Sequence, residues 1–224
     1  MKKIHYRNIG FPKTGTNWLW LQMMKHPFID GKKLQVYKEY NAPDLSSYKK
    51  IYEEFDVSIN LDTHAFHNIL GDDHYASSKR IHEHTTHMTM FLRNPYDVLN
   101  SMYNMSKNRN PNFKGTQEIY TNMNSDIVKL YSEVDKIFDY WSDCKLPILY
   151  LFYDDLVEDP KQFMHTVCEH IGIKPFYDPK RGPAFQTDKK DPLVFDNQET
   201  IDYINKGISV IENRFSRDLS HWKR

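Results

Sequence analysis

A glycine-containing loop near the start of the sequence carries a lysine at an unusual position. The stretch IGFPKTGTNWLW, residues 9–20, has Gly10 and Gly15 separated by four residues, and Lys13 lies between them. In the P-loop of ATP and GTP enzymes the lysine instead follows the second glycine and precedes a serine or threonine that holds magnesium. The position of Lys13 therefore indicates phosphate chemistry of a different kind.

The residues on either side of this loop predict a strand before it and a helix after it. Residues 4–11 are typical of a strand, and a helix is expected to begin at Thr16. At such a junction the backbone N–H groups of residues 13–17 lack intrahelical partners, and together with the helix dipole they attract an anion. A turn that only caps a helix is the alternative for the loop taken alone.

Strand and helix patterns alternate along the rest of the chain. They predict an α/β fold with a central parallel sheet flanked by helices. The further elements expected are strands at residues 56–61, 87–92 and 146–153, and helices at residues 44–55, from Asn94, from Ile119 to Trp141, from Asp159 to Gly172, and from near Asp196, where Glu199 completes a capping box. No repeat and no boundary is evident, so we expect one domain over residues 1–224.

The composition argues against several classes of protein. Thirty basic residues balance thirty acidic ones, so no net charge attracts the chain to nucleic acid or to a membrane surface. No apolar run reaches the roughly 20 residues that a membrane-spanning helix needs, and the first ten residues lack the apolar segment of a secretory signal. The two cysteines, Cys144 and Cys168, favour a reducing compartment. We therefore expect a cytoplasmic protein with a small partner, whose oligomeric state stays open.

The segment FPKTGTNWL, residues 11–19, resembles the 5′-phosphosulfate loop of sulfotransferases that use 3′-phosphoadenosine 5′-phosphosulfate (PAPS). Thr14 stands where that loop has a serine, and Asn17 stands where it has a second threonine. The resemblance implies that Lys13 meets the sulfuryl group as a fixed cation, where charge grows as the sulfur–oxygen bond breaks. It also implies that no metal is needed and that the nucleotide is held by the residues that follow Lys13, namely Thr14, Gly15, Thr16 and Asn17, with Trp18 stacked on the adenine.

Two later segments resemble the motifs that follow in this family. FLRNPYDVLNSMY, residues 91–103, is similar to the 3′-phosphate element, in which Arg93 ends a strand and Ser101 follows eight residues later. A planar guanidinium suits a phosphate, although a structural ion pair with Asp97 would also satisfy Arg93. The segment that contains Tyr153 resembles the next motif, whose tyrosine contacts the adenine. The resemblance thus implies the P-loop-like sulfotransferase fold, with PAPS as donor and adenosine 3′,5′-bisphosphate (PAP) as product.

The stretch LDTHAFH, residues 61–67, is similar to the family's Lys-Thr-His segment, whose histidine takes the proton from the acceptor. His64 is the matching residue, and an imidazole is suited to accept a proton near neutral pH. His67 and Glu39 are alternatives as the base. Asp62 stands where the family has a lysine.

A late basic triplet resembles the Arg-Lys-Gly motif that closes over the 3′-phosphate in this family. Here the order is Lys180, Arg181 and Gly182, and a solvated basic turn is the alternative. The histidine-rich stretch at residues 82–87 does not indicate a metal site, because strand alternation places His87 on the opposite face from the other two histidines.

Together these segments predict the transfer of a sulfuryl group from PAPS to a hydroxyl or amine of a small-molecule or carbohydrate acceptor. Two alternatives stay open. A P-loop nucleotide kinase is disfavoured by the position of Lys13, and a noncatalytic PAP-binding protein of the same fold is favoured by Asp62.

Overall fold

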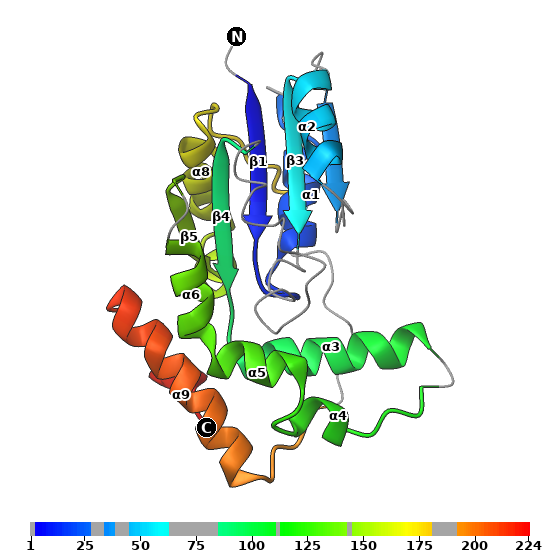
Figure 1. Cartoon of the computed structure of the whole chain (residues 1–224), viewed down its shortest axis with the longest axis vertical. Coiled ribbons are helices and arrows are strands. Elements are labelled where there is room, and N and C mark those ends of the chain that lie inside the picture. Colours follow the sequence, from blue (N-terminus) through cyan, green and yellow to red (C-terminus); the bar gives the residue numbers. More distant parts are fainter. Residues whose placement is uncertain are drawn as a thin grey trace. The chain divides into compact units, whose positions relative to one another are not determined.

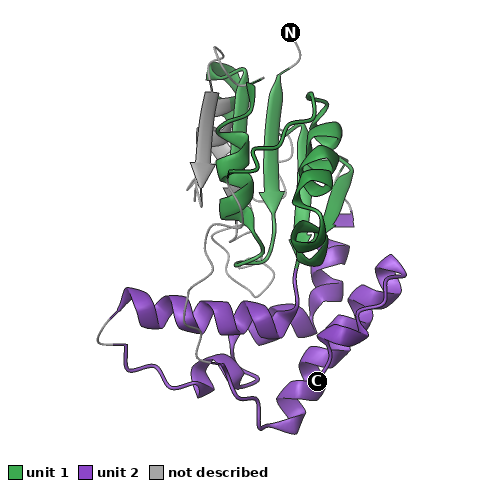
Figure 2. Ribbon diagram, turned by 180° about the vertical axis from the view of Figure 1, so that it is seen from behind, with its two compact units in different colours: residues 1–92, 143–185 green, residues 93–142, 186–224 purple. Residues whose placement is uncertain are grey.

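The computed structural model describes most of the chain, namely residues 3–27, 34–38, 45–62, 85–110, 113–142, 145–180 and 192–224. The chain divides into two compact units (Figure 2). Unit 1 comprises Met1–Leu92 and Asp143–Phe185, and unit 2 comprises Arg93–Ser142 and Gln186–Arg224. The single domain expected over the whole chain stays a prediction.

Unit 1 contains a five-stranded sheet whose order is β2-β3-β1-β4-β5 (Figure 1). Its strands are β1 (Ile4–Ile9), β2 (Leu34–Lys38), β3 (Val57–Asp62), β4 (His87–Leu92) and β5 (Ile148–Phe152). All neighbouring strands are parallel, and β1 lies in the centre between β3 and β4. The predicted α/β fold with a central parallel sheet flanked by helices is confirmed.

Helices of unit 1 cover both faces of this sheet. They are α1 (Thr16–Met23), α2 (Leu45–Glu54), α7 (Tyr153–Glu158) and α8 (Pro160–Ile171). Successive side chains of β1 point to opposite faces. Tyr6 belongs to the apolar core that includes Trp18 of α1 and Phe163 of α8, whereas the His5 ring contacts Tyr52 of α2 at 4.5 Å between centroids. Therefore α1 and α8 cover one face, and α2 covers the other.

The described part of unit 2 consists of helices and their connections. These helices are α3 (Pro95–Arg109), α4 (Glu118–Thr121), α5 (Asp126–Ser132), α6 (Val134–Ser142), α9 (Gln198–Phe215) and the 3₁₀ turn η4 (Ser220–Trp222). The ring of Phe138 on α6 packs edge-on against Phe215 of α9, and the guanidinium of Arg214 lies over the same ring. Aromatic contacts thus join α6 to α9.

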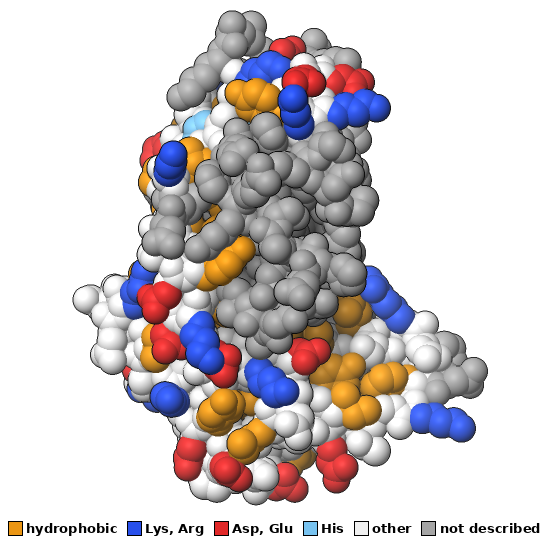
Figure 3. Space-filling view, viewed as in Figure 1, with side chains coloured by type: hydrophobic (Ala, Val, Ile, Leu, Met, Phe, Trp, Pro, Cys, Tyr) orange, Lys and Arg blue, Asp and Glu red, His pale blue; other side chains and the backbone are white. Residues whose placement is uncertain are grey.

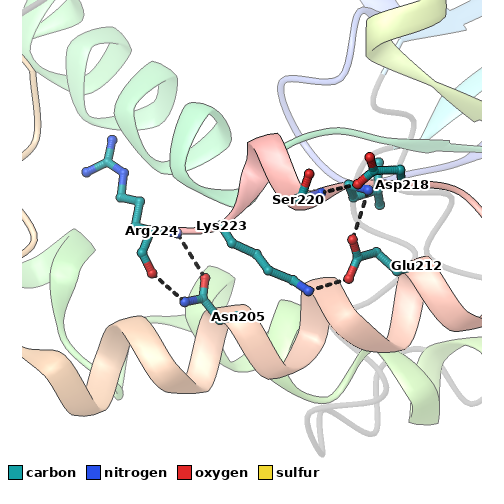
Figure 4. A network of polar contacts seen from close by, with 7 residues as sticks. Asn205, Glu212, Asp218, Ser220, Lys223 and Arg224 are labelled. Atoms are coloured by element: carbon teal, nitrogen blue, oxygen red, sulfur yellow. Dashed lines mark hydrogen bonds and ion pairs between the residues drawn. The ribbon is translucent and has the colours of Figure 1, made fainter.

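The residues that follow α9 fold back onto it (Figure 4). The Asn205 side chain donates to the Arg224 carbonyl at 2.7 Å and accepts from its N–H at 3.3 Å. Glu212 pairs with Lys223 and accepts a bond of 2.9 Å from the Leu219 N–H. These side chains hold the last described residues against α9.

Several predicted helix ends are confirmed. Asn94 caps α3 by accepting a bond from the Tyr96 N–H, Asp159 caps α8 in the same way, and Gly172 ends α8 with a φ of 77°. The helix predicted to start near Asp196 is α9, and its cap is the next residue, Asn197, which accepts from the Thr200 N–H. The position is therefore confirmed to within one residue, but Asp196 is not the cap.

The single helix predicted from Ile119 to Trp141 was also wrong, because three helices, α4, α5 and α6, occupy this stretch. The Asn122 side chain donates to the Glu118 carbonyl and accepts from the Asn124 N–H. Asparagine side chains compete in this way with helical backbone bonds, which ends α4 despite the continuous apolar spacing. The sequence also gave no signal for β2 or for α7, and Tyr153 begins α7 instead of ending β5.

No helix in the described ranges is long and apolar enough to cross a membrane. On the face viewed in Figure 3, the described lysines and arginines are interspersed with acidic side chains. No broad positive patch covers the described residues on this face, so an anion would have to be bound there by a few specific groups.

Candidate functional site

The loop between β1 and α1 contains two residues in left-handed backbone conformations. Lys13 has a φ of 63°, and Gly15 has a φ of 100°. Elsewhere in the described chain positive φ occurs at Gly172 and Ser216, which end α8 and α9. A lysine in this region costs on the order of 1 kcal/mol, and such strain is concentrated at ligand-binding and catalytic sites. Lys13 ends no helix, so helix termination does not account for its strain.

The same loop leaves the amino end of α1 open. Gly15 occupies the cap position, no side chain caps the helix, and no acidic residue lies in its first turn. The Leu19 N–H makes the first helical bond, to the Gly15 carbonyl at 3.1 Å. The preceding N–H groups of α1 therefore have no intrahelical acceptors, and the positive end of the helix dipole favours an anion there.

Gly15 lies directly against α7. A Cβ atom added at Gly15 would be 2.8 Å from Leu156 Cδ2 and 3.4 Å from Tyr153 Cδ2. The structure thus brings together two parts of the predicted site that are far apart in sequence, the loop and Tyr153. Leu156 is a contact that the sequence did not indicate.

Buried polar side chains lie at the base of the loop. The Tyr6 hydroxyl is 2.5 Å from Thr89 Oγ1, which donates to Asn8 Oδ1 at 3.1 Å. Asn8 is fully buried, and its Nδ2 atom would be 2.9 Å from a Cβ atom at Gly10. Burial raises the pKa of Tyr6 far above its ordinary value, so its hydroxyl remains a donor. The sequence analysis did not predict this series of hydrogen bonds, although Asn8 and Thr89 were visible as polar residues within apolar strands.

The threonines of the loop are buried. Thr14 is fully buried, and its hydroxyl donates to the Phe11 carbonyl at 2.8 Å, so this side chain stabilises the loop itself. Thr16 is 7% exposed. Asn17 Oδ1 is buried and has no donor among the described residues. The nucleotide contacts predicted for these three residues stay predictions.

Trp18 is 3% exposed and packs in the core of unit 1. Its ring lies edge-on to Phe163 at 6.0 Å and tilted against Tyr177 at 6.4 Å between centroids. The adenine stacking predicted for Trp18 stays a prediction, and Tyr177 is a second aromatic residue that the sequence did not single out.

The segment after α8 is attached to α1 by a side-chain amide. Gln22 Nε2 donates to the Asp178 carbonyl at 3.1 Å, and Gln22 Oε1 accepts from the Asp178 N–H at 2.9 Å. Two residues later, Lys180 is exposed and its N–H donates to Asp178 Oδ1 at 3.0 Å. The two other residues of the predicted triplet, Arg181 and Gly182, lie outside the described residues.

Arg93 and Ser101 belong to unit 2. The Arg93 side chain is 11% exposed, and its Nη2 atom is 3.8 Å from Asp97 Oδ2, a loose ion pair. The Arg93 carbonyl accepts a bond of 2.8 Å from the Tyr131 hydroxyl. Ser101 is half-buried on α3. That both residues hold one phosphate stays a prediction.

The candidate bases Glu39, His64 and His67 lie outside the described residues. For His64 and His67 the backbone shows where the preceding strand ends, because Ile9 pairs with Asp62 in the parallel register of β1 and β3. The chain therefore leaves β3 at the same end of the sheet, the carboxyl ends of its parallel strands, at which the loop leaves β1. Within the described ranges no cluster of His, Cys, Asp and Glu is arranged to hold a metal, and the His87 ring contacts His170 and Thr86.

Comparison with known proteins places these observations in context. The sulfotransferase domain family matches residues 8–211, and no curated protein matches the chain. The sulfotransferase from Alicyclobacillus acidocaldarius is similar in structure, with a TM-score of 0.65 and 14% identity over 100% of both chains.

Weaker structural likenesses extend to two other proteins. Mouse sulfotransferase SULT7A1, complexed with PAP, has a TM-score of 0.49 and 16% identity over 81% of this chain and 62% of the mouse chain. The sulfotransferase domain from the curacin biosynthetic pathway has a TM-score of 0.47 and 13% identity over 97% of this chain and 99% of that domain.

Proposed function

Since the chain belongs to the sulfotransferase domain family, we propose that it transfers a sulfuryl group from PAPS to a hydroxyl or amine of a small-molecule or carbohydrate acceptor. The observation that carries this proposal is the loop after β1, where Lys13 and Gly15 both have positive φ. Strain at a lysine that ends no helix is accounted for by a ligand that the lysine has to meet.

The residues of this loop fit a phosphosulfate group. A side chain at Gly15 would press against Leu156 of α7, α1 begins without a capping side chain, and its first turn has no acidic residue. These features suit a close approach of an anion to backbone N–H groups, without a metal ion. When bound, PAPS supplies the sulfuryl group, and PAP is the leaving group.

Lys13 provides the positive charge at the point where negative charge develops as the sulfuryl group leaves. A preorganised donor of this kind contributes about 3 to 4 kcal/mol to stabilising a transition state. The N–H groups of Thr14, Gly15, Thr16 and Asn17 complete the anion site. Tyr153, whose ring lies against the loop, contacts the adenine together with Trp18.

His64 removes the proton from the acceptor hydroxyl. The pairing of Ile9 with Asp62 supports this role, because β3, which precedes the segment with His64, ends at the same end of the sheet as β1, which precedes the loop. A neutral imidazole nitrogen accepts the proton as the acceptor oxygen bonds to sulfur. His67 and Glu39 are the alternatives.

The other end of the nucleotide is bound by Arg93 and Ser101. The Arg93 side chain is 11% exposed and its ion pair with Asp97 is loose at 3.8 Å, and a planar guanidinium matches a planar face of an anion such as the 3′-phosphate. The triplet Lys180, Arg181 and Gly182 closes over the same phosphate, where Lys180 and Arg181 supply positive charge. The proposed site of action is the cytoplasm.

Two binding measurements and one activity measurement test the proposed function. PAP should raise the melting temperature of the protein, whereas ATP with magnesium should not; the reverse result would support the kinase alternative. Incubation with PAPS and a panel of alcohols, phenols, amines and sugars should release PAP and a sulfated product. Binding of PAP without turnover on any acceptor would support the noncatalytic alternative that Asp62 favours.

A further inference from the structure

The turn that carries Arg93 is held by a buried tyrosine from another helix of unit 2. Arg93 directly precedes the Asn94 cap of α3, and its carbonyl oxygen accepts a bond of 2.8 Å from the Tyr131 hydroxyl. Tyr131 lies on α5, and its side chain is fully buried. Because an unbonded hydroxyl is costly at such a position, this bond is strongly favoured.

Tyr131 is itself fixed by close helix packing. A Cβ atom at Gly207 of α9 would lie 1.9 Å from the Tyr131 carbonyl oxygen, so the two helices are in backbone contact at this point. Burial raises the pKa of the Tyr131 hydroxyl far above its ordinary value, although the charge of Arg93 partly opposes this. The hydroxyl therefore remains protonated and donates at any ordinary pH.

The bond constrains the direction of the Arg93 side chain. In a planar peptide unit, the direction of the carbonyl group and that of the Cα–Cβ bond are related by the single torsion angle ψ. The following turn is held as well, because the Tyr96 N–H donates to Asn94 Oδ1 at 3.0 Å and the Tyr96 hydroxyl donates to Asn205 of α9 at 3.1 Å. The peptide between Arg93 and Asn94 is thus anchored on both sides.

We propose that Tyr131 is a positioning residue for recognition of the 3′-phosphate: it holds the Arg93 carbonyl so that the guanidinium points toward the phosphate. The inference rests on the proposed function, in which Arg93 binds this group. Guanidinium–phosphate bonds are directional. With the Tyr131 bond in place, Arg93 Nη2 stays 3.8 Å from Asp97 Oδ2. Without this bond, Arg93 is freer to close that distance and to pair fully with Asp97. The loop after β1 is built from other residues and should not be affected.

Two nucleotides that differ only in the 3′-phosphate test this role. Tyr131→Phe keeps the ring and removes the hydroxyl, and calorimetry on the full chain gives the Kd for PAP and for adenosine 5′-monophosphate. We expect the affinity for PAP to fall about tenfold and that for the monophosphate to change less than about twofold. Tyr120→Phe removes a hydroxyl bonded at 2.8 Å to Ser106 in the same unit, and this control should change neither affinity.

A double-mutant cycle shows whether Tyr131 acts through Arg93. In the Arg93→Ala background, Tyr131→Phe should cause no further loss of PAP affinity. Independent losses at the two positions, or equal losses for both nucleotides, would overturn the positioning role. If Tyr131→Phe does not fold, 4-fluorophenylalanine at position 131 fills the volume of the hydroxyl without donating, and the same outcomes apply.

The affinities of the unchanged protein for PAP and for the monophosphate show whether only the role of Tyr131 fails or the proposed function fails as well. Equal affinity for PAP and the monophosphate in the unchanged protein would overturn both. A preference for PAP that Arg93→Ala abolishes and Tyr131→Phe leaves intact would overturn the role of Tyr131 alone.

Discussion

The two predicted anion sites of this protein are built by different physical means. In unit 1, the loop after β1 offers backbone N–H groups, and its shape depends on positive φ at Lys13 and Gly15. In unit 2, the turn before α3 offers one side chain, Arg93, whose backbone is held by Tyr131. The first site depends on backbone conformation, and the second depends on helix packing around an ordinary turn.

This difference determines which changes each site tolerates. A backbone site fails when a residue cannot adopt the required φ or when a side chain fills the space for the ligand. A side-chain site fails when the group is removed or is aimed wrongly by its neighbours. Substitutions that separate backbone strain, packing and hydrogen bonding therefore test the comparison.

The largest effect is expected when Lys13 is replaced. Lys13→Ala removes the cation that we propose faces the leaving group, which should lower kcat by a factor corresponding to about 3 to 4 kcal/mol. Affinity for PAP should fall much less, because PAP lacks the sulfuryl group. Steady-state kinetics with PAPS and calorimetry with PAP measure the two quantities, and equal losses would mean that Lys13 only binds.

Lys13→Gly separates the charge from the backbone strain. This variant should lose turnover as Lys13→Ala does, but its free energy of unfolding should rise by about 0.5 to 1 kcal/mol, because glycine adopts positive φ without strain. Ser216→Gly, at a φ of 48° where α9 ends, is the matched control. It should gain similar stability and keep full turnover.

In unit 2 the largest effect on stability is expected at Gly207. Gly207→Ala places a Cβ atom 1.9 Å from the Tyr131 carbonyl oxygen, so α5 and α9 have to move apart. We expect a net loss of about 2 to 3 kcal/mol, because the clash exceeds the roughly 1 kcal/mol that alanine contributes to helix propensity. Chemical denaturation measures this loss. Lys206→Ala, on the exposed face of α9, should change stability by less than about 0.5 kcal/mol.

Gly15→Ala combines two smaller costs. The positive φ costs about 1 kcal/mol for alanine, and Leu156, 2.8 Å from the added Cβ atom, has to shift, so we expect a loss of about 2 kcal/mol together with loss of PAP binding. Gly172→Ala has the same φ problem but no atom within 4 Å, so it should lose only about 1 kcal/mol and keep PAP binding. Equal losses in the two variants would show that the contact with α7 does not matter.

The smallest effect is expected at the base of the loop. Thr89→Val removes the hydroxyl that joins Tyr6 to Asn8, and we expect a loss of about 1 kcal/mol in the free energy of unfolding with weaker PAP binding. Thr166→Val, on α8, removes a hydroxyl bonded to the Gln162 carbonyl near solvent. In this control the free energy of unfolding, measured by thermal unfolding, should hardly change. A loss similar to that of Thr89→Val would mean that the buried hydrogen bonds of Tyr6, Thr89 and Asn8 have no special role in stability.

Much of the fold and part of the candidate site were predictable because their signals are local. The loop after β1 was placed correctly since glycine spacing and the flanking apolar residues specify a strand, a turn and a helix. The caps at Asn94 and Asp159 were found because each cap bonds an N–H two or three residues away. The break after α4 was missed because the apolar spacing continues through it, while the side chain of Asn122 decides the backbone conformation.

The sequence by itself determined the fold class, the resemblance to the family and most of the strands and helices, because these depend on periodicity and on short motifs; β2, α7 and the division into α4, α5 and α6 were not among them. Only the tertiary structure decided that Tyr131 holds Arg93, that Gly207 allows α5 and α9 to touch, and that Thr89 links Tyr6 to Asn8. Each of these contacts joins residues at least 38 positions apart in the chain. Such contacts depend on how packed elements meet in space, and no local pattern of residues encodes that meeting.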